Sequence, residues 1–261
     1  MRQPLGQNFL VNKQIAAQIV EAAELSPEDT VVEIGPGRGV LTSLIAPQVK
    51  ELVAVELDRK LAAELQQKFA DSPTVRIVNE NFLSYTLPAA PRPLKFIANL
   101  PYYVSTAILE KILPGSNWQL AVVMVQKEVG ERITAPCGGR EYGYFSLFCQ
   151  YFSTPEIVLK VGPGNFAPPP NVDSVVVRLI NKFPPPPDEA LFPVIKHAFQ
   201  QRRKTILNSL SNTFQCPKET VLSALKEAGI EPSLRPEKLT LSCYERLTTY
   251  LKNGIIYRNK A

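Results

Sequence analysis

Short apolar runs rich in β-branched residues recur along the first half of the chain and alternate with segments of helical periodicity. The apolar runs cover residues 30–34, 51–55, 75–78, 96–98 and 120–125. Helical patterns cover residues 59–69 and 106–113. Because parallel strands need a long crossover between them, usually a helix, this alternation predicts a parallel sheet with helices on both faces. The fold class that we expect is therefore α/β, with a Rossmann-like, doubly wound sheet.

Segments on either side of this core are expected to complete it. At 11–24, apolar residues recur at helical spacing, which predicts an amphipathic helix before the first strand. Two later apolar runs, 156–161 and 172–179, have no helical pattern between them, so we expect them to pair antiparallel at an edge of the sheet. The Gly- and Pro-rich stretch 162–170 is predicted to be an ordered loop.

Four consecutive prolines at 184–187 predict a stiff, extended spacer. We place a domain boundary there, with a first domain at residues 1–183 and a second at 188–261. Short helical patterns fill the second domain at 190–201, 205–210, 219–228 and 244–252. It is therefore expected to be a small C-terminal helical domain.

The composition is that of a globular protein. Hydrophobic residues make up 45% of the 261 residues and charged residues 20%, which argues against disorder. No apolar run approaches the roughly 18 residues that a membrane span needs, so we expect no membrane partner. The first residues have the pattern neither of a signal peptide nor of an organellar presequence, and a removed leader stays open.

Cysteine and histidine usage narrows the chemistry. Cys137, Cys149, Cys216 and Cys243 are widely spaced, form no C-x-x-C pair and share the chain with a single histidine, His197. We expect neither a disulfide framework nor a metal site, but reduced thiols and a cytoplasmic location, with an organellar form left open. The single histidine lies in an apolar, helix-like stretch, which argues against Ser-His-Asp or Cys-His catalysis.

The net charge of +5 is not spread evenly. Residues 1–183 contain 17 Lys and Arg against 17 Asp and Glu, whereas residues 184–261 contain 12 against 7. The whole positive excess therefore lies after the proline spacer, where it suits a polyanionic partner. Charge alone leaves open that a small helical domain merely has a solvated basic face.

A glycine-rich turn, Gly35-Pro36-Gly37-Arg38-Gly39, directly follows the first predicted strand. Glycines let the backbone approach a nucleotide-like ligand closely at the carboxyl end of a parallel sheet. The G-x-G-x-G spacing differs from the G-x-G-x-x-G of dinucleotide-binding folds. The turn therefore favours a methyltransferase that uses S-adenosylmethionine over a nicotinamide dehydrogenase.

Glu56 ends the next predicted strand, roughly 20 residues past the turn. An acid at this position accepts hydrogen bonds from both hydroxyls of a ribose. Because enzymes that use NAD have the same device, Glu56 indicates a ribose without naming the cofactor. The alternative is a charged strand end that faces solvent.

The run Asn99-Leu100-Pro101-Tyr102 closes the fourth predicted strand, in the same crevice as the glycine turn. The Asn99 side-chain oxygen and the Leu100 carbonyl can each accept one hydrogen of an exocyclic adenine amine, so that its nitrogen faces a sulfonium methyl for in-line transfer. Pro101 fixes the turn, Tyr102 is expected to stack on an extruded base, and Phe166 to cover its other face. Taken alone, the tetrapeptide also fits an ordinary turn with a packed tyrosine.

Together these residues resemble the rRNA adenine N6-dimethyltransferase family over nearly the whole chain. Gly6-Gln7-Asn8-Phe9-Leu10 is similar to the family's N-terminal signature, and residues 166–174 to its F-x-P-x-P-x-V-x-S loop. The resemblance implies a class I S-adenosylmethionine-dependent methyltransferase, with S-adenosylhomocysteine as product. The cofactor contacts that it implies, together with those argued above, are Asn8, Leu10, Gly35, Gly37, Glu56, Asn81 and Asn99.

One position departs from the family's pattern. Where the family usually has an aspartate that accepts the adenine amine of the cofactor, this chain has Asn81. An amide oxygen can still accept that bond, but without charge assistance. Glu80 is the alternative acceptor.

Residues 198–205 and 234–239 resemble the housekeeping branch of the family, which modifies two adjacent adenines in the 3'-terminal hairpin of small-subunit (16S) rRNA during ribosome biogenesis. The erythromycin-resistance branch, which acts on large-subunit rRNA, typically lacks these segments. Arg202, Arg203 and Lys204 form the densest cationic cluster of the chain and suit RNA phosphate contacts. The resemblance thus implies the pre-30S particle as partner, and we expect the protein to act as a monomer.

Three other functions stay open on the sequence. A ribosome-assembly or RNA-binding factor would keep the fold without depending on methyl transfer, and an enzyme of the erythromycin-resistance type would modify large-subunit rRNA. A nicotinamide dehydrogenase is the third, although nothing in the sequence supplies its general acid. The intact motifs at Gly35, Glu56 and Asn99 favour the dimethyltransferase.

Overall fold

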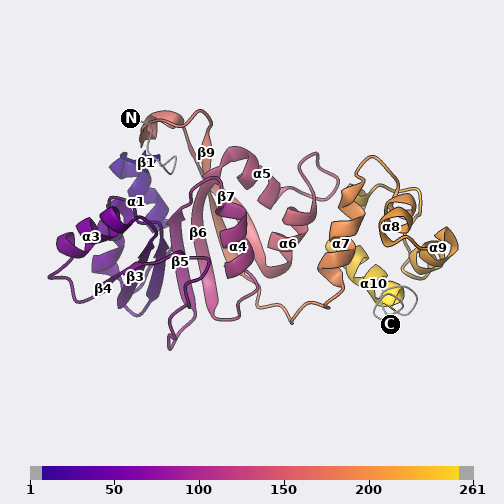
Figure 1. Ribbon diagram of the computed structural model, residues 1–261, viewed down its shortest axis with the longest axis horizontal. Coiled ribbons are helices and arrows are strands. Elements are labelled where there is room, and N and C mark those ends of the chain that lie inside the picture. The colour runs from indigo at the N-terminus through magenta and orange to yellow at the C-terminus, as the bar shows by residue number, and fades with distance from the viewer. Residues whose placement is uncertain (1–7, 253–261) are drawn as a thin grey trace. The chain divides into compact units, whose positions relative to one another are not determined.

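The computed structural model describes residues 8–252 (Figure 1). Gly6 and Gln7 of the N-terminal signature lie outside the described residues. No helix within the described part of the chain is both long and apolar enough to cross a bilayer.

Contacts between residues divide the chain into two compact units. The first unit contains residues 1–131 and 152–183, and the second unit contains 132–151 and 184–261. The chain passes from the first unit to the second for the last time at the four prolines, where the boundary was predicted. Residues 132–151, however, were predicted in the first domain and belong to the second unit. This segment packs with the second unit because the buried Tyr142 donates a hydrogen bond from its hydroxyl to the Leu239 carbonyl (3.2 Å).

A seven-stranded sheet with the order β4-β3-β2-β5-β6-β9-β7 forms the centre of the first unit. The parallel strands are β2 (Thr30–Ile34), β3 (Glu51–Glu56), β4 (Val75–Asn79), β5 (Leu94–Asn99) and β6 (Trp118–Gln126). β9 (Ser174–Asn181) pairs antiparallel with β6 and with β7 (Ser153–Val161), which forms the edge. The expected fold class, a mostly parallel α/β sheet with an antiparallel edge strand, is confirmed.

Helices flank this sheet (Figure 1). They are α1 (Lys13–Glu21), α2 (Val40–Ile45), α3 (Arg59–Lys68), α4 (Ser105–Ile112) and α5 (Lys127–Thr134). A further helix, α6 (Tyr144–Phe152), belongs almost entirely to the second unit. α1 begins later than the periodicity predicted, because the Asn12 side chain caps it by accepting hydrogen bonds from two backbone N–H groups. The sequence analysis missed α5 and α6; α6 is nearly all apolar, so it has no alternation of faces to read.

The stretch 162–170 is more structured than a loop. It contains a 3-10 turn at Pro163–Asn165 and a two-residue strand, β8 (Phe166–Ala167), which pairs antiparallel with β1 (Phe9–Leu10). The pairing continues at Asn165, whose carbonyl accepts from the Val11 N–H at 2.9 Å. A strand of two residues has no period to read in a sequence, and pairing with a segment more than 150 residues away created this one.

The helices after the prolines are those that the periodicity predicted, with shifted ends. They are α7 (Leu191–Gln200), α8 (Ile206–Phe214), α9 (Lys218–Glu227) and α10 (Leu241–Leu251). The caps account for the boundaries: Thr205 and Thr240 each accept a backbone N–H at the start of the helix that follows.

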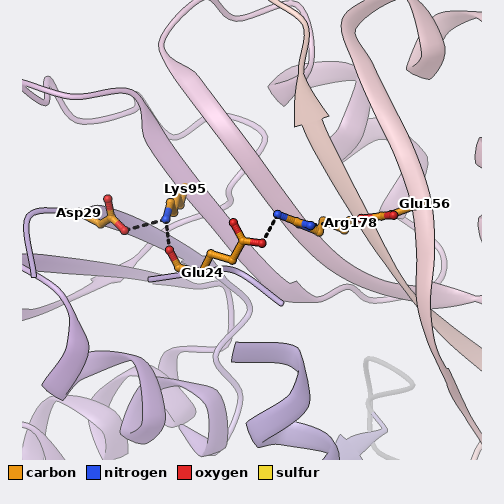
Figure 2. A network of polar contacts seen from close by, with 5 residues as sticks. All are labelled: Glu24, Asp29, Lys95, Glu156 and Arg178. Carbon is orange, nitrogen blue, oxygen red and sulfur yellow. Dashed lines mark hydrogen bonds and ion pairs between the residues drawn. The ribbon is translucent and has the colours of Figure 1, made fainter. Parts of the chain in front are cut away.

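A network of charged residues links the connection between α1 and β2 to the sheet (Figure 2). Lys95, near the start of β5, contacts the Asp29 carboxylate at 2.8 Å and donates to the Glu24 carbonyl. Arg178 on β9 contacts the carboxylates of Glu24 and Glu156. The side chains of Lys95 and Asp29 are 9% and 5% exposed, so each charge depends on the other for compensation.

We predict that Lys95→Met destabilises the protein by about 3 kcal/mol, because Asp29 would stay buried without its counter-charge. Urea unfolding followed by circular dichroism measures the effect. Arg76→Met is the matched control, since it breaks a half-exposed ion pair with Glu51 and should cost under about 1 kcal/mol. Equal losses in the two variants would contradict the importance of the buried pair.

Candidate active site

The parallel register brings three motifs to one level at the carboxyl edge of the sheet. Ile34 pairs with Val55 on one side and with Ala98 on the other. The residues that follow, Gly35, Glu56 and Asn99, therefore leave the sheet side by side. This is the edge at which open α/β sheets bind their ligands.

The glycine turn adopts a backbone that other residues reach only with strain. Gly35, Gly37 and Gly39 have φ angles of 66°, 58° and 73°. A Cβ on Gly39 would lie 2.7 Å from the Leu65 side chain, and one on Gly37 would lie 3.1 Å from the Phe9 ring. The turn thus keeps its backbone close to its neighbours and leaves the space above it open.

Glu56 holds the turn in place. One carboxylate oxygen accepts from the Gly37 N–H at 3.0 Å, and the other from the Asp58 N–H at 2.9 Å. Burial raises the pKa of Glu56, while these two N–H groups oppose the rise. Because each oxygen has a second lone pair, the carboxylate can still accept hydrogen bonds from a ribose.

Glu33 is a site residue that the sequence analysis missed. It lies within β2, all five residues of which are buried, and it lines the same cavity as the glycine turn. Thr42 donates to one of its carboxylate oxygens at 2.7 Å, while the other is buried without a partner among the described residues. Burial raises the pKa of Glu33 from 4.5 to about 7. The signal in the sequence was a charged residue inside an apolar strand.

Asn99 ends β5 with its side-chain oxygen available. Its Nδ2 donates to the Asn8 carbonyl at 3.4 Å, which fixes the orientation of the amide. Within the described part of the chain, Oδ1 accepts no hydrogen bond. The sequence-based interpretation of Asn99 as a hydrogen-bond acceptor is compatible with this geometry.

Tyr102 is tethered at its tip. Its hydroxyl lies 2.8 Å from the Ser174 Oγ, and its carbonyl accepts from the Ser105 Oγ at 3.2 Å. Burial raises the pKa of Tyr102, so the phenol stays protonated. A ring held at both ends presents a fixed face to the cavity that it lines.

Phe166 differs from its predicted position. It is 4% exposed and belongs to the hydrophobic core, and it does not line the cavity described here. The pairing of β1 with β8 explains this, because it places Phe166 opposite Leu10. In this conformation Phe166 provides no second wall for a base.

The cavity collects most of the predicted site residues. Those that line it are Asn8, Leu10, Gly35, Gly37, Glu56, Asn99, Leu100, Pro101 and Tyr102. Phe9 and Arg38 line it too, with the guanidinium 4.7 Å from the centre of the phenyl ring. The sequence analysis gave these two no contact role, because a cation–π pair across 29 positions leaves no local pattern.

Asn81 lies in an adjoining depression that shares Gly35, Glu56 and Pro101 with the first. Its side-chain oxygen accepts from the Leu83 N–H at 3.0 Å. Because an N–H needs an acceptor, this bond also settles which end of the amide is the oxygen. Glu80, the alternative acceptor, lines the same depression.

The predicted cationic cluster lies in the second unit, in the turn between α7 and α8. All three side chains are exposed. Arg202 donates to the carbonyls of Arg140 and Tyr142, at 2.8 and 3.2 Å. Part of its guanidinium is therefore used within the unit, and Arg203 and Lys204 remain as the cations most open to a ligand.

Comparisons with known proteins identify the family. The family described as ribosomal RNA adenine dimethylase matches residues 1–252. The chain belongs to this family. Two relatives, both named ribosomal RNA small subunit methyltransferase A, come from Alkaliphilus metalliredigens (42% identical, covering 94% of this chain and 89% of the relative) and Levilactobacillus brevis (40%, 97% and 90%).

Solved structures agree with this membership. A dimethyladenosine transferase from Plasmodium falciparum is 25% identical and matches with a TM-score of 0.81, over 95% of this chain and 98% of that one. The 23S rRNA methyltransferase ErmE is 28% identical, with a TM-score of 0.74 over 94% and 100%. The predicted methyltransferase fold and the predicted family of rRNA adenine dimethylases are confirmed, and the dehydrogenase interpretation is set aside.

The buried carboxyl of Glu33 predicts a pH dependence of stability in this dimethylase. Because its folded pKa is raised above its unfolded value, the folded state binds more protons between pH 4.5 and about 7, and stability falls as pH rises through that window. Glu33→Gln stays neutral throughout, so its stability relative to the parent should increase over the same window.

Denaturant midpoints at pH 5 and pH 7.5 measure this change. Glu64→Gln, at an exposed helix position, is the control and should show no such trend. A constant difference between Glu33→Gln and the parent would show that Glu33 is ionised in the folded state at both pH values.

Proposed function

We propose that this dimethylase transfers methyl groups from S-adenosylmethionine to N6 of two adjacent adenines in the 3'-terminal hairpin of small-subunit rRNA, during ribosome biogenesis. The observation that carries the proposal is the position of the Asn99 side-chain oxygen. Among the described residues it has no hydrogen-bond donor, and it lies at the level of the glycine turn and Glu56. The two relatives named as small-subunit methyltransferases support the choice of ribosomal subunit.

The residues present fit the proposed cofactor. The glycine turn forms a cradle that a Cβ would fill. The Glu33 oxygen that has no partner among the described residues would accept a hydrogen bond from the cofactor's cationic amino group. Glu56 would accept hydrogen bonds from the ribose, while Asn8 and Leu10 line the cavity from the N-terminal segment. When bound, S-adenosylmethionine supplies an electrophilic methyl group on a sulfonium.

This chain's own residues would orient the amine that receives the methyl group. Asn99 Oδ1 and the Leu100 carbonyl each accept one N6 hydrogen, which draws electron density toward the nitrogen and aims its lone pair. The bond from Asn99 Nδ2 to the Asn8 carbonyl keeps Oδ1 turned away from the N-terminal segment. The tethered ring of Tyr102 offers a stacking face for the extruded base.

The second unit would hold the RNA. It contains 14 Lys and Arg against 8 Asp and Glu, because residues 132–151 add two arginines and one glutamate to the 12 and 7 of residues 184–261. Arg203 and Lys204 are two of its three exposed cations in the α7–α8 turn. Phosphate contacts of this kind position RNA without reading its sequence, so the shape of the pre-30S particle would supply specificity.

We infer further that the protein acts as a monomer in the cytoplasm. Size-exclusion chromatography with light scattering checks the oligomeric state.

The decisive experiment offers labelled S-adenosylmethionine to unmethylated small and large ribosomal subunits separately and maps the modified bases. Label should appear in the small subunit, as N6,N6-dimethyladenine. Asn99→Ala should lower transfer about a thousandfold or more while the Kd for S-adenosylhomocysteine changes by less than about threefold, because the lost contact is to the reacting amine. Label in the large subunit would overturn the substrate assignment, and retained turnover of Asn99→Ala would overturn the role of Asn99.

A second prediction concerns binding to the particle. Replacing Arg203 and Lys204 together by alanine should weaken binding and reduce the slope of log K against log salt by about 1 to 2, since fewer counterions are released from RNA phosphates. Lys218→Ala with Lys226→Ala is the matched control, because it removes two exposed charges from the same unit. If both double variants changed the slope equally, the effect would come from net charge and not from the α7–α8 turn.

A further inference from the structure

One lysine of the first unit binds three carbonyl oxygens of the turn that follows β4. Lys111, in the last turn of α4, donates from its ammonium group to three carbonyl oxygens of a single short segment. The acceptors are Phe82 at 2.6 Å, Leu83 at 2.9 Å and Tyr85 at 2.6 Å. An ammonium group has three N–H donors, so one side chain uses its full capacity on this segment.

The segment that Lys111 holds, residues 81–85, is a tight turn. The carbonyl of Asn81 accepts from the N–H groups of Ser84 and Tyr85, and its side-chain oxygen accepts from the Leu83 N–H. This winding leaves the carbonyls of Phe82, Leu83 and Tyr85 directed to one side, where they resemble the negative end of a helix. A cation there stabilises the turn, and the ammonium also lies 5.0 Å from the centre of the Phe82 ring.

The same turn is one wall of the depression that adjoins the Glu56 cavity. Asn81, Phe82 and Leu83 line it on this side. Because Glu56 is placed for a ribose, the nucleobase attached to that ribose would lie in this depression. Its other walls are largely apolar, as a planar base requires.

Exposed apolar side chains mark the depression as a binding surface. Leu57 is 51% exposed, Leu83 39% and Tyr103 69%, and all three line it. Large apolar side chains gathered in one hollow and left uncovered are typical of a ligand site. A base stacked between them would cover this surface.

We propose that Lys111 is a positioning residue for the adenine subsite of the cofactor. It fixes the turn 81–85 without touching the ligand. α4 also follows directly from the Asn99–Tyr102 segment, and its first residue, Ser105, donates to the Tyr102 carbonyl. Lys111 therefore joins the wall of the nucleobase subsite to the helix that carries the segment proposed to orient the target amine.

Burial lowers the pKa of Lys111, and the nearby Glu80 carboxylate opposes that change. The ammonium form is the one that has three donors for three carbonyls. Deprotonation would leave two donors for three carbonyls, and removal of the group would take away the side-chain donor that all three share, although the Phe82 carbonyl would keep the Tyr85 N–H. The expected consequence is a looser wall and weaker binding of the base.

The inference rests on the proposed use of S-adenosylmethionine, and the test separates the two. Lys111→Met should raise the Kd for S-adenosylhomocysteine about tenfold, measured by calorimetry. It should raise the Kd for 5'-methylthioadenosine by the same factor, because both ligands contain the adenosine group. At saturating S-adenosylmethionine, kcat should stay within about twofold of the parent.

Three further variants complete the design. Lys111→Arg keeps the charge and several N–H donors and should restore the Kd to within about threefold. Lys60→Met makes the same chemical change at a lysine whose side chain is 86% exposed, and should leave both affinities unchanged. If Lys111→Met does not fold, Lys111→Gln, whose amide can still donate to the turn, takes its place and should give an intermediate loss.

The outcomes are distinct. Unchanged Kd values in Lys111→Met, a loss for S-adenosylhomocysteine alone, or a fall in kcat without a change in Kd would each overturn the positioning role while leaving the proposed function intact. If the unaltered protein bound neither ligand, the proposed function itself would fail, and this inference with it.

Discussion

The parallel register of β2 with both of its neighbours is the constraint on which the site depends. It places Gly35, Glu56 and Asn99 at one level of the sheet edge, although they are up to 64 positions apart in the chain. A shift of one residue in either pairing would turn the side chains at the end of that strand to the opposite face. The residues proposed as cofactor cradle, ribose acceptor and amine acceptor are thus positioned by the backbone of rigid strands, which hold a site more precisely than loops do.

Buried charged side chains of the first unit have partners in one region of the sheet and lack one in another. Around the start of β2 and β5, Lys95 and Asp29 neutralise each other in a buried pair, and Arg178 joins the network from β9. At the carboxyl edge, one oxygen of Glu33 is buried without a partner within the described chain. An unsatisfied buried carboxyl costs stability, and it is tolerated at a binding site because a ligand can satisfy it. The ion pairs of Lys95 and Arg178 thus stabilise the same sheet that contains Glu33.

Asn81, which stands where the family usually has an aspartate, has a structural role that its chemistry alone did not suggest. The amide oxygen that was expected to accept from the cofactor's adenine already accepts from the Leu83 N–H. Asn81 therefore serves the shape of the turn, as does Lys111 from the other side. In the proposed adenine subsite, recognition of the base would then depend on how well the turn is held as well as on one side-chain acceptor. In the second unit, Arg202 similarly contributes to the fold through the carbonyls of Arg140 and Tyr142.

The sequence by itself determined the class of the fold, the position of the parallel strands and the motifs at their ends, because these are local signals: β-branched runs, helical periods, glycines in a tight turn and a proline after a strand. It also indicated the family. Glu33 belongs with these local signals, because a charged residue inside an apolar strand is visible in the sequence itself. Only the tertiary structure decided that Phe166 is buried opposite Leu10, that residues 132–151 join the second unit, and that Lys111 holds the turn after β4. Each of these depends on a contact between segments far apart in the chain, and such contacts leave no period or spacing in the sequence.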